Sequence, residues 1–322
     1  VALSADGTEV VDSKKLHKCD GAVYSKMSMN VDGGEAGTGV LNITADNEGL
    51  DTELHLTING GTINITSGND GINTNEDNVS VTTINGGSLN IRVTGETGEG
   101  DGIDSNGWLV INGGDVTAAA CSTSGDAGLD ASMGITLNGG TVMASGNMYD
   151  PIDGGSQNFA VFSFASRQAG GETYTLQNDA GEAVGTWTPA NDFTYLVVSS
   201  PDLAAGDYTL WQGDTQLAGG ASDTMGGPGG MGCGRPMDGE EPPADFDPQQ
   251  PPEDGARPQR PADGEAPPDG TEPPAGGRGP GGGGGQVTAA DLSETFALTD
   301  GGNFFTGVSP LETETSAETS AS

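Results

Sequence analysis

The feature that most constrains this chain is a turn that recurs at a nearly constant interval. Asn-Gly-Gly begins at positions 59, 85, 112 and 138, so successive copies lie 26, 27 and 26 residues apart. A weaker copy, Asp-Gly-Gly, begins at position 32. A second anchor precedes each turn: Gly or Pro, then Ile or Leu, then Asp or Asn, as at 49–51, 71–73, 102–104, 128–130 and finally 151–153. Self-similarity at one period indicates a supersecondary unit that stacks on itself.

The repeated unit is predicted to consist of β-strands. Leu56 and Ile58 precede the first full turn and Ile63 and Ile65 follow it, and this alternation is typical of half-buried strands. The two strands around each turn could form a hairpin. We favour pairing of each strand with its counterpart one repeat later, because equivalent apolar residues then stack. The result is a parallel β-helix in which one buried ladder contains Ile58, Ile84, Ile111 and Leu137.

The pattern changes along the chain and predicts five regions. Residues 1–155 hold the β-helix coils, and because Val1 lies inside an apparent strand we expect the true N-terminus to be missing. Residues 156–220 alternate short apolar runs with turns and predict an antiparallel β cap over the open end of the stack. Fourteen of the 18 prolines fall in 221–286, which predicts a disordered acidic linker. Residues 287–310 predict one or more returning strands, and 311–322 a disordered tail.

The strong negative charge restricts the partners of the chain. A formal charge of −37 disfavours direct binding to nucleic acid or to anionic membrane surfaces, because like charges repel. The three cysteines form no disulfide framework, and no apolar run reaches the ~18 residues of a membrane span, so membrane insertion is not expected. Such a chain recruits cations, and we expect a monomer.

Acidic residues recur at the second anchor and form two predicted columns. The first contains the last residue of each anchor, namely Asp51, Asn73, Asp104, Asp130 and Asp153, and the second lies one or two residues before each anchor. Strands of successive coils lie ~4.8 Å apart, so stacked carboxylates repel one another unless a cation lies between them. Calcium takes six to eight oxygen ligands of this kind. The simpler alternative is that Asp, Asn and Gly occupy these turns for backbone reasons alone. The predicted calcium ligands are Glu48, Asp51, Asp70, Asp101, Asp104, Asp126, Asp130, Asp150 and Asp153.

With the repeats DGINTNEDNVSVTTINGG and GDGIDSNGWLVINGG, the chain resembles a bacterial carbohydrate-binding β-helix family known from clostridia and formerly listed as a domain of unknown function. The likeness covers about residues 10–215. It implies a right-handed β-helix like that of pectate lyases, bound Ca²⁺, secretion or surface display, and binding of acidic polysaccharide such as polygalacturonate. The nine acidic positions named above match the family pattern, whereas Asn73 and Ala127 depart from it.

The distribution of basic residues favours a binder over an enzyme. A polyuronate lyase uses Lys or Arg as its base, yet between residues 27 and 220 the only such residues are Arg92 and Arg167. A hydrolase needs two carboxylates, which the columns would supply, so a lyase or hydrolase and a structural surface adhesin remain the alternatives. Trp108 could stack on a sugar ring or pack between coils. We therefore expect an extracellular, non-catalytic protein that binds acidic polysaccharide through calcium.

Overall fold

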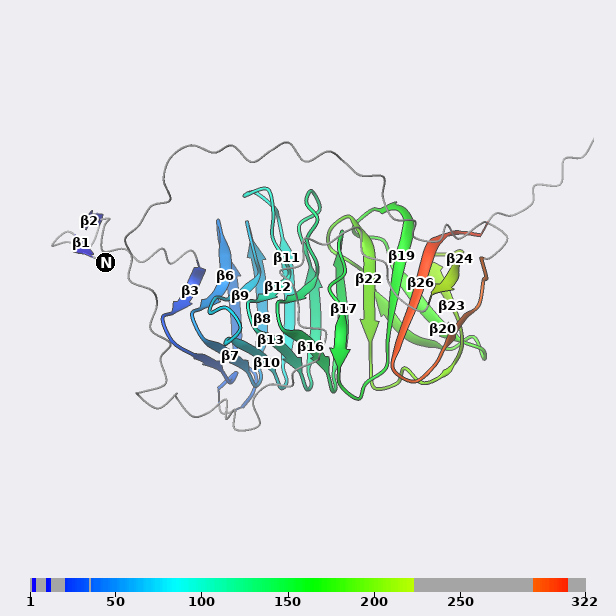
Figure 1. Cartoon of the computed structure of the whole chain (residues 1–322), viewed down its shortest axis with the longest axis horizontal. Coiled ribbons are helices and arrows are strands. Elements are labelled where there is room, and N and C mark those ends of the chain that lie inside the picture. The colour runs from blue at the N-terminus through cyan, green and yellow to red at the C-terminus, as the bar shows by residue number, and fades with distance from the viewer. Residues whose placement is uncertain (1, 4–9, 13–20, 35, 223–291, 312–322) are drawn as a thin grey trace, which may run out of the picture.

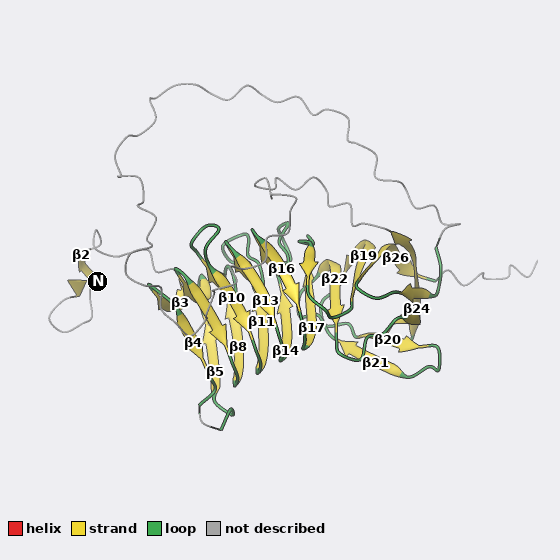
Figure 2. Ribbon diagram, turned by 60° about the horizontal axis from the view of Figure 1, so that its bottom comes forward, coloured by secondary structure: helices red, strands yellow, loops and turns green. Residues whose placement is uncertain are grey.

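The computed structural model describes residues 2–3, 10–12, 21–34, 36–222 and 292–311. Strands joined by turns and irregular loops make up these residues, and Figure 2 shows the strands side by side along one axis. No helix within these ranges could cross a bilayer. The predicted linker lies outside the described residues except for Ala221 and Ser222, which end a strand, and the predicted tail lies outside them except for Leu311.

Five coils of three strands each form the β-helix (Figure 1), and equivalent strands pair in parallel to give three sheets. Sheet 1 contains β3 (Gly21–Ser25), β6 (Glu48–Thr52), β9 (Ile72–Thr74), β12 (Ile103–Ser105) and β15 (Leu129–Ala131). Sheet 2 contains β4 (Met29–Val31), β7 (His55–Ile58), β10 (Val81–Ile84), β13 (Trp108–Ile111), β16 (Gly134–Leu137) and β18 (Ile152–Gly154). The part of sheet 3 that belongs to the β-helix contains β5 (Val40–Thr44), β8 (Thr62–Ser67), β11 (Ser88–Val93), β14 (Asp115–Ala119) and β17 (Thr141–Gly146). A separate antiparallel pair joins β1 (Ala2–Leu3) and β2 (Val10–Asp12).

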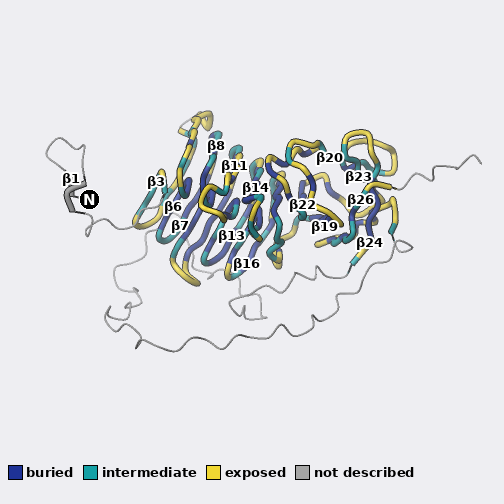
Figure 3. The backbone as a smooth tube through the Cα atoms, turned by 90° about the horizontal axis from the view of Figure 1, so that it is seen from above, coloured by how far each residue is buried: buried dark blue, intermediate teal, exposed yellow. Residues whose placement is uncertain are grey.

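The predicted apolar ladder is confirmed. Ile84 pairs with Ile58 on one side and with Ile111 on the other, and Ile111 pairs with Leu137. All four are at most 1% exposed. Full burial of such a side chain stabilises the fold by roughly 1.5–3 kcal/mol, so the stacked interior is the main source of stability. Figure 3 shows these buried strands in dark blue, with exposed turns at their ends.

The recurring glycines are explained by close approach between coils. The second glycine of each Asn-Gly-Gly turn has φ near +90°, as at Gly61 (89°) and Gly87 (90°), which residues with a side chain rarely adopt. At the other anchor, a Cβ on Gly71 would lie 2.2 Å from Cγ2 of Ile91 and 2.6 Å from the carbonyl oxygen of Gly102. Both anchors therefore need glycine in order to stack.

The cap grows directly out of sheet 3. Strand β17, the last strand of the β-helix in sheet 3, pairs antiparallel with β22 (Phe193–Ser199). Strand β22 in turn pairs with β19 (Phe159–Gln168). The sheet then continues through β26 (Gly302–Pro310), β24 (Thr215–Ser222), β23 (Gly206–Gln212), β20 (Tyr174–Asn178) and β21 (Ala183–Trp187), while β25 (Phe296–Leu298) pairs with β23. Pairing in the cap is antiparallel except between β19 and β26, which Figure 1 shows side by side. The open edge of the stack is thus covered, as predicted.

Alternate residues of β19 and β22 pack into two different hydrophobic cores. Phe159, Val161 and Val197 extend the interior of the β-helix. Their neighbours Phe162 and Leu196 belong to a second core inside the cap, which also includes Met143 from the outward face of β17. The cap strands therefore curl over the outer face of sheet 3.

Candidate acidic site on sheet 1

The outward face of sheet 1 carries the first predicted acidic column. Tyr24, Asp51, Asn73, Asp104 and Asp130 are Cα partners in successive coils. The prediction that Asp153 ends this column is wrong. Strand β18 pairs with β16 of sheet 2, so it does not extend sheet 1.

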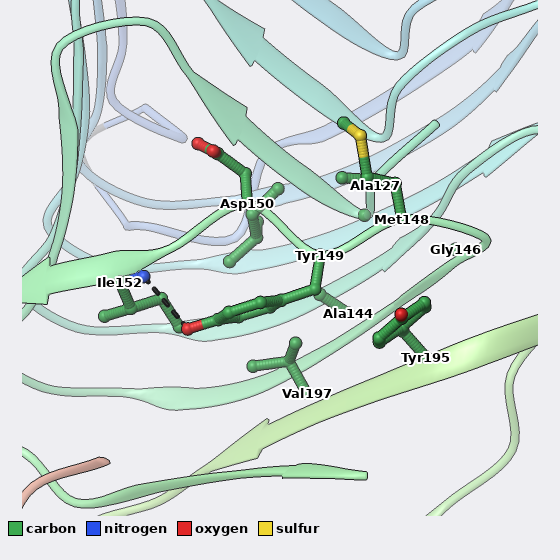
Figure 4. Close-up of a pocket in the computed structure, with 11 residues that line it drawn as sticks. Ala127, Ala144, Gly146, Met148, Tyr149, Asp150, Ile152, Tyr195 and Val197 are labelled. Carbon is green, nitrogen blue, oxygen red and sulfur yellow. Dashed lines mark hydrogen bonds between the residues drawn. The ribbon is translucent and has the colours of Figure 1, made fainter. Parts of the chain in front are cut away.

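The chain leaves the column after β17 because it closes the end of the helix. Tyr149 and Phe159 each make an edge-to-face contact with Phe304, with ring centroids 6.0 Å apart, and the backbone N–H of Ile152 donates to the Tyr149 hydroxyl. Figure 4 shows Tyr149, its hydrogen bond with Ile152 and the other residues around a small cavity, whose volume of about 10 Å³ has room for at most one water. Asp150 stays with sheet 1, where its carboxylate accepts a hydrogen bond from the backbone N–H of Ala131.

The second column lies in the turns before sheet 1, and it has a partly structural role. The Asp70 carboxylate accepts from the backbone N–H of Asp101 at 2.7 Å, and the Asp101 carboxylate accepts from that of Ala127 at 2.6 Å. Asp126 accepts from the backbone N–H of Gly100. The backbone explanation of these acids is therefore correct for one oxygen of each carboxylate. The other oxygens remain available as ligands.

In the first column, Asp51 accepts a hydrogen bond from Nδ2 of Asn75, whereas Asp104 is less engaged. The Asp104 side chain makes no hydrogen bond or ion pair with the described residues. Asn73, which is 8% exposed, donates from Nδ2 to the Glu48 carboxylate at 2.9 Å, while its Oδ1 is buried without a partner. An unpaired buried carbonyl oxygen costs free energy, so this atom requires an explanation. A cation at the column would supply the missing partner.

Burial and mutual repulsion raise the pKa values of this cluster. Burial, followed by the charges of Asp70 and Asp130, raises the pKa of Asp104 to about 8. Burial raises the pKa of Glu48 to about 7, with smaller contributions from Asp51 and Asp70.

The remaining members of the cluster shift in the same direction. Burial is again the largest cause for Asp70, whose pKa rises to about 6, with the charge of Asp126 adding to the rise. The pKa of Asp101 is raised well above its usual value by burial and by the charge of Asp130, and burial also raises that of Asp51. No Lys or Arg forms an ion pair with Glu48, Asp51, Asp70, Asp101 or Asp104 within the part of the chain that the structure describes.

The donor set suits a hard cation. Every group is a carboxylate or amide oxygen, which Ca²⁺ prefers. In the described ranges, no three His, Cys, Asp or Glu side chains are already arranged to hold a metal ion. Ion binding would therefore draw the carboxylates of neighbouring coils together around the unpaired Asn73 oxygen. Asn73 departs from the acidic pattern of the sequence, and only the structure shows that its Oδ1 lacks a donor.

Trp108 is 7% exposed and lies in β13 of sheet 2. Its ring has little surface left for a sugar, so packing between coils is the alternative that the structure favours.

Comparison with protein families identifies the family of the chain. The model of a family described as carbohydrate-binding domain-containing protein matches residues 2–174, more than half of the 322 residues. The chain belongs to this carbohydrate-binding family. The matched range contains all five coils and the start of the cap. No curated protein and no solved structure gave a significant match.

Proposed function

We propose that this carbohydrate-binding protein binds acidic polysaccharide through calcium ions held on sheet 1. The observation that carries the proposal is the group of Glu48, Asp51 and Asp104 around the buried, unpaired Oδ1 of Asn73. None of these three carboxylates forms an ion pair with a described basic residue. Calcium bound there neutralises the repulsion between coils. It also offers coordination positions to the carboxylates of a polyuronate, which an anionic surface would otherwise repel.

The two halves of the column have different exposure and take different parts in the proposal. Glu48, Asp51 and Asn73 are at most 8% exposed, so an ion beside them is enclosed and stabilises the fold. Asp104 and Asp130 are more exposed, and an ion beside them keeps positions open for sugar carboxylates. The ligand therefore binds over the C-terminal coils of sheet 1.

The experiment is a titration of polygalacturonate onto the full chain with Ca²⁺ and with EDTA. Calcium-dependent binding supports the bridging role, and equal affinity in EDTA contradicts it. Asp104→Asn should weaken binding about tenfold, as expected when a ligand of roughly 1.4 kcal/mol is lost. The matched control is Asp179→Asn, an exposed carboxylate in the cap turn, which should bind as the parent does.

A second candidate function has one observation in its favour. The Asp104 carboxyl, with its pKa raised to about 8, remains largely protonated at neutral pH beside ionised carboxylates, as in glycoside hydrolases. Reducing ends or unsaturated products that accumulate during the same titration, and that Asp104→Asn abolishes, would establish catalysis. We expect binding without product release.

The setting follows from the same proposal. Extracellular calcium modules bind with dissociation constants of roughly 0.1–1 mM, which suits a secreted or surface-displayed protein. We expect the chain to act there as a monomer, and light scattering on the calcium-loaded protein tests this.

A further inference from the structure

A groove outside the acidic face lies where the cap overhangs the β-helix. Its volume is about 270 Å³, close to the ~300 Å³ at which small-molecule sites begin. The floor comes from the outward residues of β14 and β17, and the opposite wall comes from β21. The polar and aromatic side chains that line it include Asp115, Thr117, Thr141, Thr186, Trp187 and Asp202.

Trp187 has an unused hydrogen-bond donor in this groove. It is 8% exposed, and its indole N–H donates to none of the described residues. Solvent reaches this N–H at the edge of the groove, so a ligand acceptor can replace water there, while the ring itself packs in the core of the cap. The ring is held in place from below, because a Cβ on Gly185 would lie 2.2 Å from Cζ2 and Cη2 of the indole.

The walls define the charge of a suitable ligand. Asp115 and Asp202 both line the groove and are exposed. Carboxylates accept hydrogen bonds from hydroxyl groups and repel anions. Thr117 and Thr141 add hydroxyls that both donate and accept. An uncharged molecule rich in hydroxyl groups fits this set.

The groove continues as a track along the helix. On sheet 3, Thr117 is the Cα partner of Asn90, which is the partner of Asn64, and that residue is the partner of Asn42. Asn90 Nδ2 donates to Asn64 Oδ1 at 3.0 Å, and Asn64 Nδ2 donates to Asn42 Oδ1 at 2.8 Å. Asn64 therefore keeps one N–H and one acceptor position free for a ligand. From Thr117 to Asn42 the track covers three coil spacings, roughly 14 Å.

We propose that the cap groove and this amide track form a second glycan site, which takes a neutral polysaccharide. The end of the glycan chain enters the groove and places a hydroxyl group at the indole N–H of Trp187. Its hydroxyl groups donate to Asp115 and Asp202, and the following sugars lie along the amides of sheet 3. This site needs no calcium and is separate from the acidic face of sheet 1, so it does not depend on the proposed function of that face.

The test is affinity electrophoresis of the full chain in EDTA with three neutral polysaccharides: hydroxyethylcellulose, arabinoxylan and galactomannan. At least one should retard the protein. Trp187→Phe keeps the apolar ring and removes the N–H, and Asp115→Asn removes an exposed acceptor charge. Each should weaken the retardation about tenfold, the change expected for one well-made hydrogen bond to a ligand.

The controls separate this site from the acidic face. Asp179 lies outside the groove, in the turn between β20 and β21, and Asp104 lies on sheet 1. The Asp179→Asn and Asp104→Asn variants should therefore bind neutral glycan as the parent does. Circular dichroism melts show whether Trp187→Phe keeps the fold, and the exposed Asp115→Asn is the second variant if it does not. The proposal is overturned if none of the three glycans binds in EDTA, or if binding survives both groove variants unchanged.

Discussion

The same coils stack two kinds of side chain, and the two stacks behave differently. At the Asn-Gly-Gly turns, Asn59 donates to Asp32, and Asn85, Asn112 and Asn138 each donate from Nδ2 to the Oδ1 of the preceding asparagine at 2.8–2.9 Å. On sheet 1, carboxylates stack at the same spacing. An amide carries both donors and acceptors, so a stack of amides satisfies itself, whereas ionised carboxylates only accept. The repeated acid stack therefore needs protons or a cation, and the amide stack needs neither.

Of the changes considered, removal of calcium should have the largest effect on the stability of the acid stack relative to the amide stack. An ion that binds only the folded state raises the free energy of unfolding by about 2.7 kcal/mol at a hundredfold excess over its Kd. For a domain of this size that corresponds to a fall in Tm of about 5–10 °C when EDTA is added. Differential scanning fluorimetry with and without calcium measures it. An unchanged Tm at saturating calcium would mean that the acid stack is stable without a cation.

The second largest effect should be the pH dependence of the free energy of unfolding of the calcium-free protein. The folded-state pKa values of Glu48 and Asp104, about 7 and about 8, lie above the ordinary values of 4.5 and 3.8. Between those limits the folded state binds more protons than the unfolded state, so its stability falls as pH rises from about 4 to about 8. Calcium binds the ionised form and should flatten this slope. Urea unfolding at several pH values tests the sign, and stability that rises over this range would refute it.

Asp104→Asn should partly convert the acid stack into an amide stack. Removing one charge relieves like-charge repulsion by on the order of 1 kcal/mol near a protein surface, so the calcium-free protein should become more stable at pH 8. At the same time, the stabilisation by calcium should shrink. Chemical unfolding of the variant and of Asp179→Asn, each with and without calcium, separates the two effects. A destabilised calcium-free variant would argue against repulsion in the stack.

Asn85→Asp makes the reverse exchange in the amide ladder and should have the smallest effect. The substitution removes the donor to Asn59 and keeps an acceptor for Asn112, so the expected loss is about 0.5–1 kcal/mol. Because the ladder is exposed, the new carboxylate stays hydrated, and no new calcium response should arise. Asn85→Ser, which shortens the side chain without adding charge, is the matched control in the same unfolding assay.

Much of the β-helix could be predicted because its determinants are local and repeated. The Asn-Gly-Gly turns and the alternation around Ile58 and Ile84 determine strand, turn and register together. The stacking of Asp51, Asn73, Asp104 and Asp130 follows from that register. The calcium assignment goes beyond it and stays a prediction.

The features that were missed depend on contacts that no repeat records. Asp153 leaves its column because Tyr149 and Phe304 close the helix, and Phe304 lies far along the chain. The cap groove exists because β21 overhangs β14 and β17, which depends on the order of strands in a single long sheet. The alternation of a sequence predicts which residues lie on each face of a strand. It does not predict which distant strand covers that face.

The most direct test of the acid stack is a crystal structure of the calcium-loaded protein with an anomalous difference map. We predict an ion on the outward face of sheet 1, about 2.3–2.6 Å from Asn73 Oδ1 and from carboxylates of the neighbouring coils. Calcium found only elsewhere, with Asn73 Oδ1 still unpaired on a sheet 1 face that holds no ion, would contradict the account.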